Sequence, residues 1–354
     1  MAGDADAAQP APSAQSVRAQ IIVRGLYRSL LGREPDPAGL QHWSAIIVQD
    51  GSVGKVSDAL VNSDEFQRKM DRDTKGHRTT AALAAQILPL LNADPISIVD
   101  VGAQELESEE HVYAAIAHFG LPHHIIGFEP LEEKIRERQR QNPEQPITLL
   151  PTFIGDGASH TFHINNPDAT SSLLPLNHAF TQLMVDLSQL HTVTTESVNT
   201  STLDCALQET GRIDFLKLDI QGFELPALQF ASAVLARTNV VHCEVAFAEI
   251  YQHQALFSDV EALLREHGFY FLDFSSTCHY PYHCASNSAT RDRLGWADAV
   301  FFKHEERLPD PRDLLGQLVI AALLYEKPSF AEFLAQRYDA ATGASLAPIF
   351  NSVR

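Results

Sequence analysis

The stretch Ile96-Ser97-Ile98-Val99-Asp100-Val101-Gly102 decides the fold class of this chain. Its β-branched apolar residues predict a buried strand, and Gly102 predicts a sharp turn directly after that strand. In open α/β sheets, ligands bind beyond the carboxyl ends of the strands. Asp100 and Gly102 are therefore candidate ligand-binding residues.

Similar apolar runs follow along the chain, and helical stretches separate most of them. Parallel strands need such crossover helices, so the alternation predicts a doubly wound α/β domain with seven strands over residues 79–305. The predicted strands are ISIVDV, HIIGFEP, ITLLPTFIG, DFLKLDI, VVHCEVA, FYFLDF and DAVFFKH. The leucine-rich residues 308–354 predict a helical extension that packs either on this domain or on a partner subunit, in a homo-oligomer.

Acidic residues stand at five predicted strand ends, namely Asp100, Glu129, Asp156, Asp219 and Glu244. Glu129, followed by Pro130, ends the second strand, where a carboxylate can accept hydrogen bonds from both hydroxyls of a ribose. The alternative is that Glu129 only interacts with the N-terminus of the helix that starts at Leu131. The pattern predicts a ligand site along one edge of the sheet.

Two segments precede the α/β domain. Residues 1–15 predict a disordered lead without the apolar core of a signal peptide. Residues 16–75 predict a small all-α domain, in which Asp36 caps a helix that begins at Pro37. The phrase YRSLLGREPD (Tyr27–Asp36) resembles a small helical domain of unknown function from bacterial surface and glycan-related proteins, and this resemblance implies no chemistry.

The charge balance limits the classes of partner. The chain has 26 Lys and Arg against 45 Asp and Glu, so 26 − 45 = −19, which disfavours nucleic acids and anionic membranes. No apolar run reaches the roughly 18 residues of a membrane span. The four cysteines are too few for a disulfide scaffold and favour a cytoplasmic enzyme. The segment CHYPYHC (Cys278–Cys284) is either a zinc site of unusual spacing or, as we prefer, a polar aromatic loop near the active site.

Several ordered motifs resemble the FkbM-type family of methyltransferases. They are VDVGA, GFEP, SSLL (Ser171–Leu174), TLD (Thr202–Asp204), DFLKLDIQGFEL (Asp214–Leu225), the segment from Glu244 to Phe269, and WADAVFF. The resemblance covers roughly residues 96–302 of the sequence. It implies a Rossmann-like class I fold with the last strand antiparallel, S-adenosylmethionine as cofactor, and O-methylation of a sugar, glycan or small metabolite.

The resemblance also implies roles for individual residues. Asp100, Gly102 and Ala103 correspond to the first cofactor motif, Glu129 and Pro130 to the ribose site, and Asp156 to the adenine end. Lys217, Asp219, Gly222 and Glu224 correspond to the motif beside the methyl acceptor. Ser171 and Ser172 either close over the cofactor and acceptor or cap the next segment; we count Ser172 among the cofactor-binding residues.

Two positions depart from the family pattern. Many members continue the first motif as Ala-Asn-x-Gly, whereas here Ala103 is followed by Gln104, Glu105 and Leu106. The loop under the methionine part of the cofactor is therefore expected to be shaped differently. Gln221 stands where many members carry Glu.

A hydroxyl acceptor is a very weak acid, so its methylation benefits from a base or a metal. The predicted catalytic residues are Asp219, Glu244 and Lys217. Asp219 either acts as the base or binds Mg²⁺ together with Glu244. Lys217 shares a strand face with Asp219, and we prefer an ion pair that keeps Asp219 or Glu224 ionised over direct catalysis.

Two other classes of protein compete with this interpretation. A nicotinamide-dependent oxidoreductase would need G-x-G-x-x-G after the first strand, and DVGAQEL lacks it. A non-catalytic scaffold or binding protein of a glycan or surface pathway stays open as the alternative.

Overall fold

The computed structural model describes residues 13–31, 33–104, 111–141, 143, 145–284, 290–308 and 310–351. Most of the predicted lead, and Glu105 and Leu106 of the altered first motif, lie outside these residues. The chain divides into two compact units, Met1–Thr79 and Thr80–Arg354, each of which is described by itself.

The first unit is helical, as predicted. It contains α1 (Ala14–Leu26), a π-helical turn η1 (Tyr27–Leu31), α2 (Pro37–Asp50), α3 (Val53–Val61) and the start of α4 (Asp64–Leu91). The Asp36 side chain accepts a hydrogen bond from the Gly39 N–H, so the predicted cap before Pro37 is confirmed. Val23, Val56 and Leu60 form its small core. Among the described residues, no helix is both long and apolar enough to cross a bilayer.

The second unit is built on a seven-stranded sheet, which confirms the predicted α/β fold. Across the sheet, the strands are β3 (Ile147–Leu150), β2 (His123–Phe128), β1 (Ile96–Val101), β7 (Ile213–Leu218), β8 (Thr238–Ala246), β10 (Arg293–Lys303) and β9 (Phe269–Tyr280). Neighbouring strands run parallel except for β10, which is antiparallel to both β8 and β9. The antiparallel strand is the one that the family resemblance implies.

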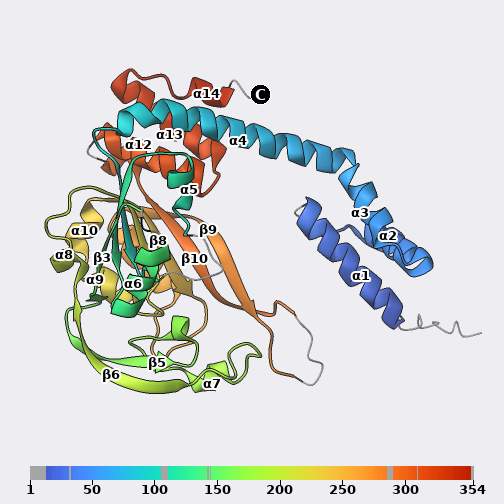
Figure 1. Ribbon diagram of the computed structural model, residues 1–354, viewed down its shortest axis with the longest axis horizontal. Helices are drawn as coiled ribbons and strands as arrows, with labels where there is room; N and C mark the ends of the chain where they lie inside the picture. The colour runs from blue at the N-terminus through green and yellow to red at the C-terminus, as the bar shows by residue number, and fades with distance from the viewer. Residues whose placement is uncertain are drawn as a thin grey trace, which may run out of the picture. The chain divides into compact units, whose positions relative to one another are not determined.

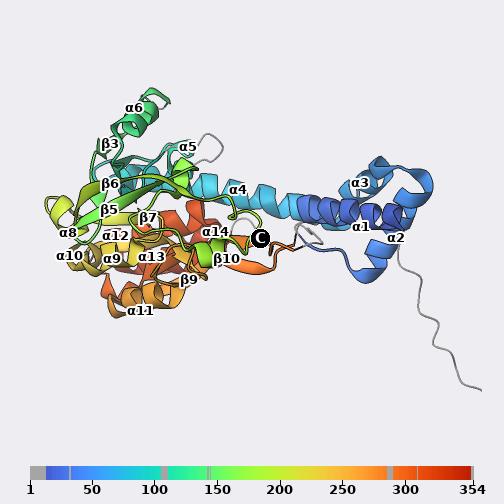
Figure 2. The same cartoon turned by 90° about the horizontal axis from the view of Figure 1, so that it is seen from below.

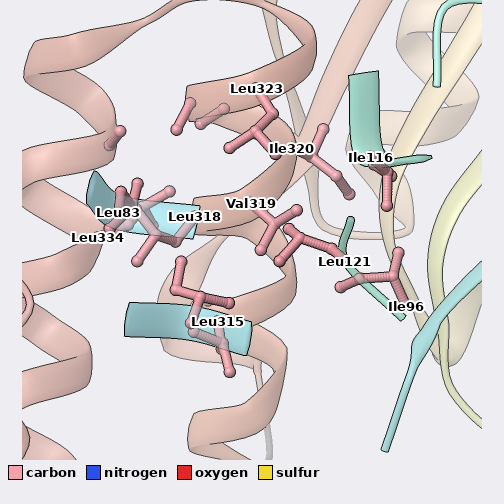
Figure 3. Packing of buried hydrophobic residues seen from close by; sticks show 14 of the residues in the cluster. Leu83, Ile96, Ile116, Leu121, Leu315, Leu318, Val319, Ile320, Leu323 and Leu334 are labelled. Carbon is pink, nitrogen blue, oxygen red and sulfur yellow. The ribbon is translucent and has the colours of Figure 1, made fainter. Parts of the chain in front are cut away.

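The C-terminal residues cover one face of this sheet, together with the end of α4 and α5 (Ala114–His118). These residues form α12 (Pro311–Val319), the π-helical turn η4 (Ile320–Leu324), α13 (Pro328–Thr342) and α14 (Pro348–Asn351), drawn in red above the sheet in Figure 1. Leu315, Leu318 and Val319 pack against Leu83 and Ile96 (Figure 3). The leucine-rich segment is thus buried within its own chain, and a homo-oligomer stays a prediction.

Short helices cover the opposite face. They are α8 (Leu203–Ala206), α9 (Glu224–Gln229), α10 (Ser232–Ala236) and α11 (Phe257–Glu266), and Figure 2 shows α11 beside β9. The helix α6 (Glu132–Gln141) follows β2 in the chain. Residues in a strand alternate between the two cores, as Ile98 and Val99 of β1 do.

The predicted strand ITLLPTFIG is wrong as a single element. Only Ile147–Leu150 joins the main sheet, whereas Phe153–Ile154 forms β4 of a second sheet. Pro151 lies between them, and proline has no N–H with which to continue a ladder. The second sheet has the order β4-β6-β5, with β5 at Ser159–Asn165 and β6 at Thr192–Ser201. The remaining elements are the 3₁₀ turns η2 (Asp168–Thr170) and η3 (Glu305–Arg307), and α7 (His178–Thr181).

Candidate active site

A cavity of about 580 Å³ lies at the carboxyl ends of the parallel strands. This volume falls within the range of small-molecule sites. Seven of the predicted site residues line it, namely Gly102, Glu129, Pro130, Ser172, Lys217, Asp219 and Glu244. Asp100, Ala103 and Asp156 are outside its lining, so the fold brings together most but not all of the predicted set.

Gly102 is where β1 meets the turn after β7. Its φ is +84°, and a Cβ built on it would lie 1.9 Å from the carbonyl oxygen of Asp219. Glycine alone fits such an approach. The Asp219 N–H also donates to the Val101 carbonyl at 3.0 Å. The ends of β1 and β7 therefore touch, which places the predicted cofactor and acceptor residues in one site.

Glu129 is buried and lines the cavity directly after β2. Its Oε1 accepts a hydrogen bond from the Leu131 N–H at 2.8 Å, the helix interaction that the sequence left as the alternative. Burial raises the pKa of Glu129 to about 7, although the Leu131 N–H opposes this shift. A carboxylate that is bound on one oxygen and faces a cavity is still able to accept hydroxyl hydrogens.

The Glu224 carboxylate stabilises the turn after β7. Gln221 and Gly222 have φ of +54° and +95°, and Glu224 Oε1 accepts from the N–H groups of Ile220 (2.8 Å) and Gly222 (3.1 Å). Burial raises the pKa of Glu224 to about 7. Because its carboxylate holds this backbone turn, Glu224 shapes the site from beneath and is not among the residues that line the cavity.

Lys217 and Gln221 hold the carboxylate of Asp219 from two sides. Lys217 Nζ lies 3.4 Å from Asp219 Oδ2, and Gln221 Nε2 donates to Asp219 Oδ1 at 3.0 Å. The ion pair that we preferred for Lys217 is thus present with Asp219, but none links Lys217 to Glu224 in the described part. Burial alone would lower the pKa of Lys217, but Asp100 and Asp219 raise it. Lys217 therefore stays charged beside the Asp219 carboxylate.

Glu244 lines the cavity on β8, the strand next to β7. Its pKa is well above the usual value, first because of burial and then because the carboxylates of Asp219, Glu224 and Asp298 repel its charge. Within the described residues its carboxylate accepts no hydrogen bond. Such a partly buried acid with a raised pKa in a cavity is typical of functional sites.

Two further cavity residues, His242 and Asp298, did not emerge from the sequence. His242 Nε2 lies 3.5 Å from Asp298 Oδ1, and its Nδ1 lies 2.9 Å from the Tyr325 hydroxyl. Ser276 donates to the other oxygen of Asp298 at 2.6 Å. Period-two alternation would have found His242, which precedes Glu244 by two residues and points to the same face. The pairing of Asp298 with Glu244 across β10 and β8 depends on strand register, which the sequence does not reveal.

Asp156 does not lie at a strand end of the main sheet, contrary to the prediction. It sits in the turn between β4 and β5, where its Oδ1 accepts from the Ala158 N–H at 2.9 Å and lies 2.8 Å from His160 Nε2. The cause is the break at Pro151, which moves this segment into the second sheet. Thr152 and Phe153 line the cavity in its place.

Ser171 and Ser172 line the cavity, but their hydroxyls are already bound within the protein. Ser172 donates to the Gln221 carbonyl at 2.6 Å and accepts from the Leu174 N–H, whereas Ser171 accepts from the Asn165 N–H. Ser172 therefore ties the segment before Leu174 to the turn after β7, and Ser171 ties it to the end of β5.

The described residues do not fit a metal centre. They contain no group of three or more His, Cys, Asp or Glu side chains placed to share an ion. Asp219, one of the two predicted Mg²⁺ ligands, is instead paired with the Lys217 ammonium group. Within the described residues, no such group supports the zinc alternative for CHYPYHC either, and none of the four cysteines is in a disulfide. Tyr280 of this segment accepts a hydrogen bond from Trp296 of the cavity wall.

Comparison with known proteins supports this description. The family model of the methyltransferase FkbM domain matches residues 100–271, and that of a domain of unknown function, DUF4214, matches residues 13–70. No curated protein matches the chain.

Distant likenesses occur among solved structures. The chain is similar to a TehB-like SAM-dependent methyltransferase from Corynebacterium glutamicum (11% identity, 63% of this chain, 88% of that one, TM-score 0.29). It is also similar to a putative methyltransferase from Thermoplasma acidophilum (9%, 61%, 75%, TM-score 0.30) and to M. jannaschii TYW2 in complex with AdoMet (10%, 64%, 77%, TM-score 0.26).

The domain match and the motifs around the cavity agree on one assignment. The segment 100–271 contains every predicted cofactor and acceptor residue. The chain carries a methyltransferase FkbM domain at residues 100–271, which makes it an S-adenosylmethionine-dependent methyltransferase, and a DUF4214 domain at residues 13–70 precedes it in the sequence.

Proposed function

We propose that this enzyme transfers the methyl group of S-adenosylmethionine to a hydroxyl group of a sugar, glycan or small metabolite. The observation that carries the proposal is the distribution of carboxylates in one cavity. Glu129 follows β2, on one side of β1 and β7, whereas Glu244 and Asp298 lie on β8 and β10, on the other side. One side suits a ribose, and the other suits an acceptor that must lose a proton.

The cofactor would rest on the loop after β1 and on the end of β2. Gly102 permits close approach of its backbone, and Glu129 would accept hydrogen bonds from the ribose hydroxyls. With Asp156 outside the cavity, we assign the adenine contacts to the apolar side chains of Leu131, Phe153 and Phe162, which line it. When bound, S-adenosylmethionine supplies an electrophilic methyl group on a positively charged sulfur.

The acceptor hydroxyl would donate a hydrogen bond to Asp219. As the acceptor oxygen forms its bond to the methyl carbon, Asp219 takes up the hydroxyl proton, and the electron pair of the broken carbon–sulfur bond stays on sulfur. Lys217 and Gln221 fix the Asp219 carboxylate for this step. Glu244, whose burial favours the neutral acid, would donate a hydrogen bond to the acceptor.

A labelled-methyl transfer screen tests the proposal. The full chain is incubated with S-adenosylmethionine carrying a ¹³C-methyl group and with panels of neutral sugars, glycans and small alcohols. Mass spectrometry detects a labelled product. The ¹³C NMR chemical shift of its methyl carbon then distinguishes an O-methyl from an N-methyl group. Transfer to nitrogen, sulfur or carbon would contradict O-methylation. Binding of S-adenosylhomocysteine without any transfer would favour the scaffold alternative.

A further inference from the structure

A buried charge cluster lies beneath the loop that follows β1. Asp100 is 0% exposed and Arg138, on α6, is 1% exposed. Arg138 Nη1 donates to the Ala103 carbonyl at 2.6 Å and lies 3.3 Å from Asp100 Oδ2. Its Nη2 donates to the Tyr113 hydroxyl oxygen at 2.7 Å, and that hydroxyl donates to Asp100 Oδ2 at 2.6 Å. The cluster is thus a closed ring of hydrogen bonds around one ion pair.

The cluster touches the cavity wall at three places. Ala103 lies between Gly102 and Gln104, which both line the cavity. Lys217 Nζ lies 3.5 Å from Asp100 Oδ1, and His111, which stacks on Tyr113, lies 3.8 Å from Asp100 Oδ2. Lys217 and His111 line the cavity as well. Through Asp100 and Arg138, the cluster therefore connects the loop after β1, the segment before α5 and the strand β7.

Stability alone does not account for such a cluster. Burying a guanidinium and a carboxylate costs solvation free energy, and apolar residues of similar volume often pack at least as stably. Arg136 and Arg140, the neighbouring arginines of α6, stay exposed. Burial alone would raise the pKa of Asp100, but Lys217 and Arg138 hold it below its usual value. The cluster is therefore charged, and what it adds is fixed geometry at the Ala103 carbonyl.

We propose that Arg138, paired with Asp100, is a positioning residue for cofactor binding, because it anchors the loop after β1 through the Ala103 carbonyl. This role fits the altered first motif, in which the glycine usual after Ala103 is absent. A buried guanidinium holds the start of a loop that lacks the usual later glycine. Asp100 does not line the cavity. In this role it acts through Arg138 and Lys217 rather than by touching the cofactor.

Titration of S-adenosylhomocysteine into the full chain tests the proposal. We expect Arg138→Met to weaken its affinity by about tenfold or more, since a buried charge-assisted hydrogen bond to the loop is lost. The matched control Arg140→Gln, on the exposed part of the same helix, should bind within about twofold of the wild type. An R138M protein that folds and binds like the wild type would overturn the proposal.

Chemical rescue separates positioning from a merely structural role. In Arg138→Ala, added ethylguanidinium should refill the space of the lost side chain and recover much of the affinity, while leaving the wild type unchanged. A loss of affinity that ethylguanidinium does not recover would count against the proposal. If neither Arg138 variant folds, Tyr113→Phe tests the proposal instead. This change removes the hydroxyl that links Arg138 to Asp100 and keeps the packing of the aromatic side chain.

We expect Tyr113→Phe to bind S-adenosylhomocysteine about threefold or more weakly than the wild type. Equal affinity would overturn the proposal. Failure of the wild type to bind would contradict the cofactor assignment itself and this inference with it. Failure of O-methylation alone would leave these binding results unaffected, so the two proposals can fail separately.

Discussion

At the scale of single residues, Gly102 stands at a position that has no room for a side chain. Its positive φ and the 1.9 Å approach of any Cβ to the Asp219 carbonyl both exclude other residues. Gly120 offers a matched comparison, because its φ is +66° but no heavy atom lies within 4 Å of a Cβ placed on it.

We therefore expect Gly102→Ala to lower the free energy of unfolding by more than about 3 kcal/mol, from strain and clash together. Gly120→Ala should cost only about 1 kcal/mol, from the left-handed backbone alone. Urea unfolding measures both values. Similar losses in the two variants would show that the contact between Gly102 and Asp219 is not rigid.

The raised pKa of Glu129 predicts that cofactor affinity depends on pH. Ribose hydroxyls are donors, so binding favours the ionised carboxylate, whose pKa in the free enzyme is about 7. Affinity for S-adenosylhomocysteine should therefore be highest above this pKa and fall about tenfold between pH 8 and pH 6. Calorimetry across this range measures it.

The controls for this prediction are two amide variants. Glu129→Gln should bind more weakly at pH 8 and lose the pH dependence, whereas Glu132→Gln, at an exposed position of α6, should behave like the wild type. A wild-type affinity that stays flat from pH 6 to pH 8 would mean that Glu129 does not titrate in this way.

Which site residues the sequence could reveal depended on how local their geometry is. Glu129 and Asp219 follow directly from strand ends, so counting strands was enough. The predicted position of Asp156 was wrong because the chain leaves the main sheet at Pro151 and joins the second sheet. Arg138 and Asp298 reach the site through helix packing and strand register, which join residues far apart in the chain.

At the scale of elements, α12 is fixed to the sheet by an ion pair between the partly buried Arg312 and the buried Asp214. Arg312 Nη1 and Nη2 donate to the two carboxylate oxygens of Asp214 at 3.1 Å each. Burial raises the pKa of Asp214, and Arg312 opposes this shift. The sequence predicted helices in this region, but their position on the sheet depends on this pair and on the apolar contacts around Leu315.

Removing the arginine should therefore leave a buried carboxylate without its main partner. We expect Arg312→Met to lower the free energy of unfolding by about 3–5 kcal/mol in urea. Arg337→Gln, on the exposed side of α13, should change it by no more than about 0.5 kcal/mol. A small effect of R312M would mean that apolar packing alone holds α12.

The stretch 131–141 contains the single helix α6, whereas the stretch 224–236 is split into α9 and α10. The apolar pattern continues across that break, so periodicity alone could not locate it.

At the scale of the whole molecule, the sheet brings carboxylates from four strands to a single cavity, and the two sides of that cavity serve different steps. Binding should depend on the side of β1 and β2, and methyl transfer on the side of β7, β8 and β10. A variant on the second side should therefore lose methyl transfer without losing cofactor affinity.

The most direct test is Asp219→Asn, measured for both properties against the control Glu266→Gln, which removes an exposed charge. We expect S-adenosylhomocysteine affinity to stay within about twofold, while the rate of ¹³C-methyl transfer to an acceptor found in the screen falls about 10²- to 10⁴-fold. Full transfer activity in the D219N enzyme would contradict the account.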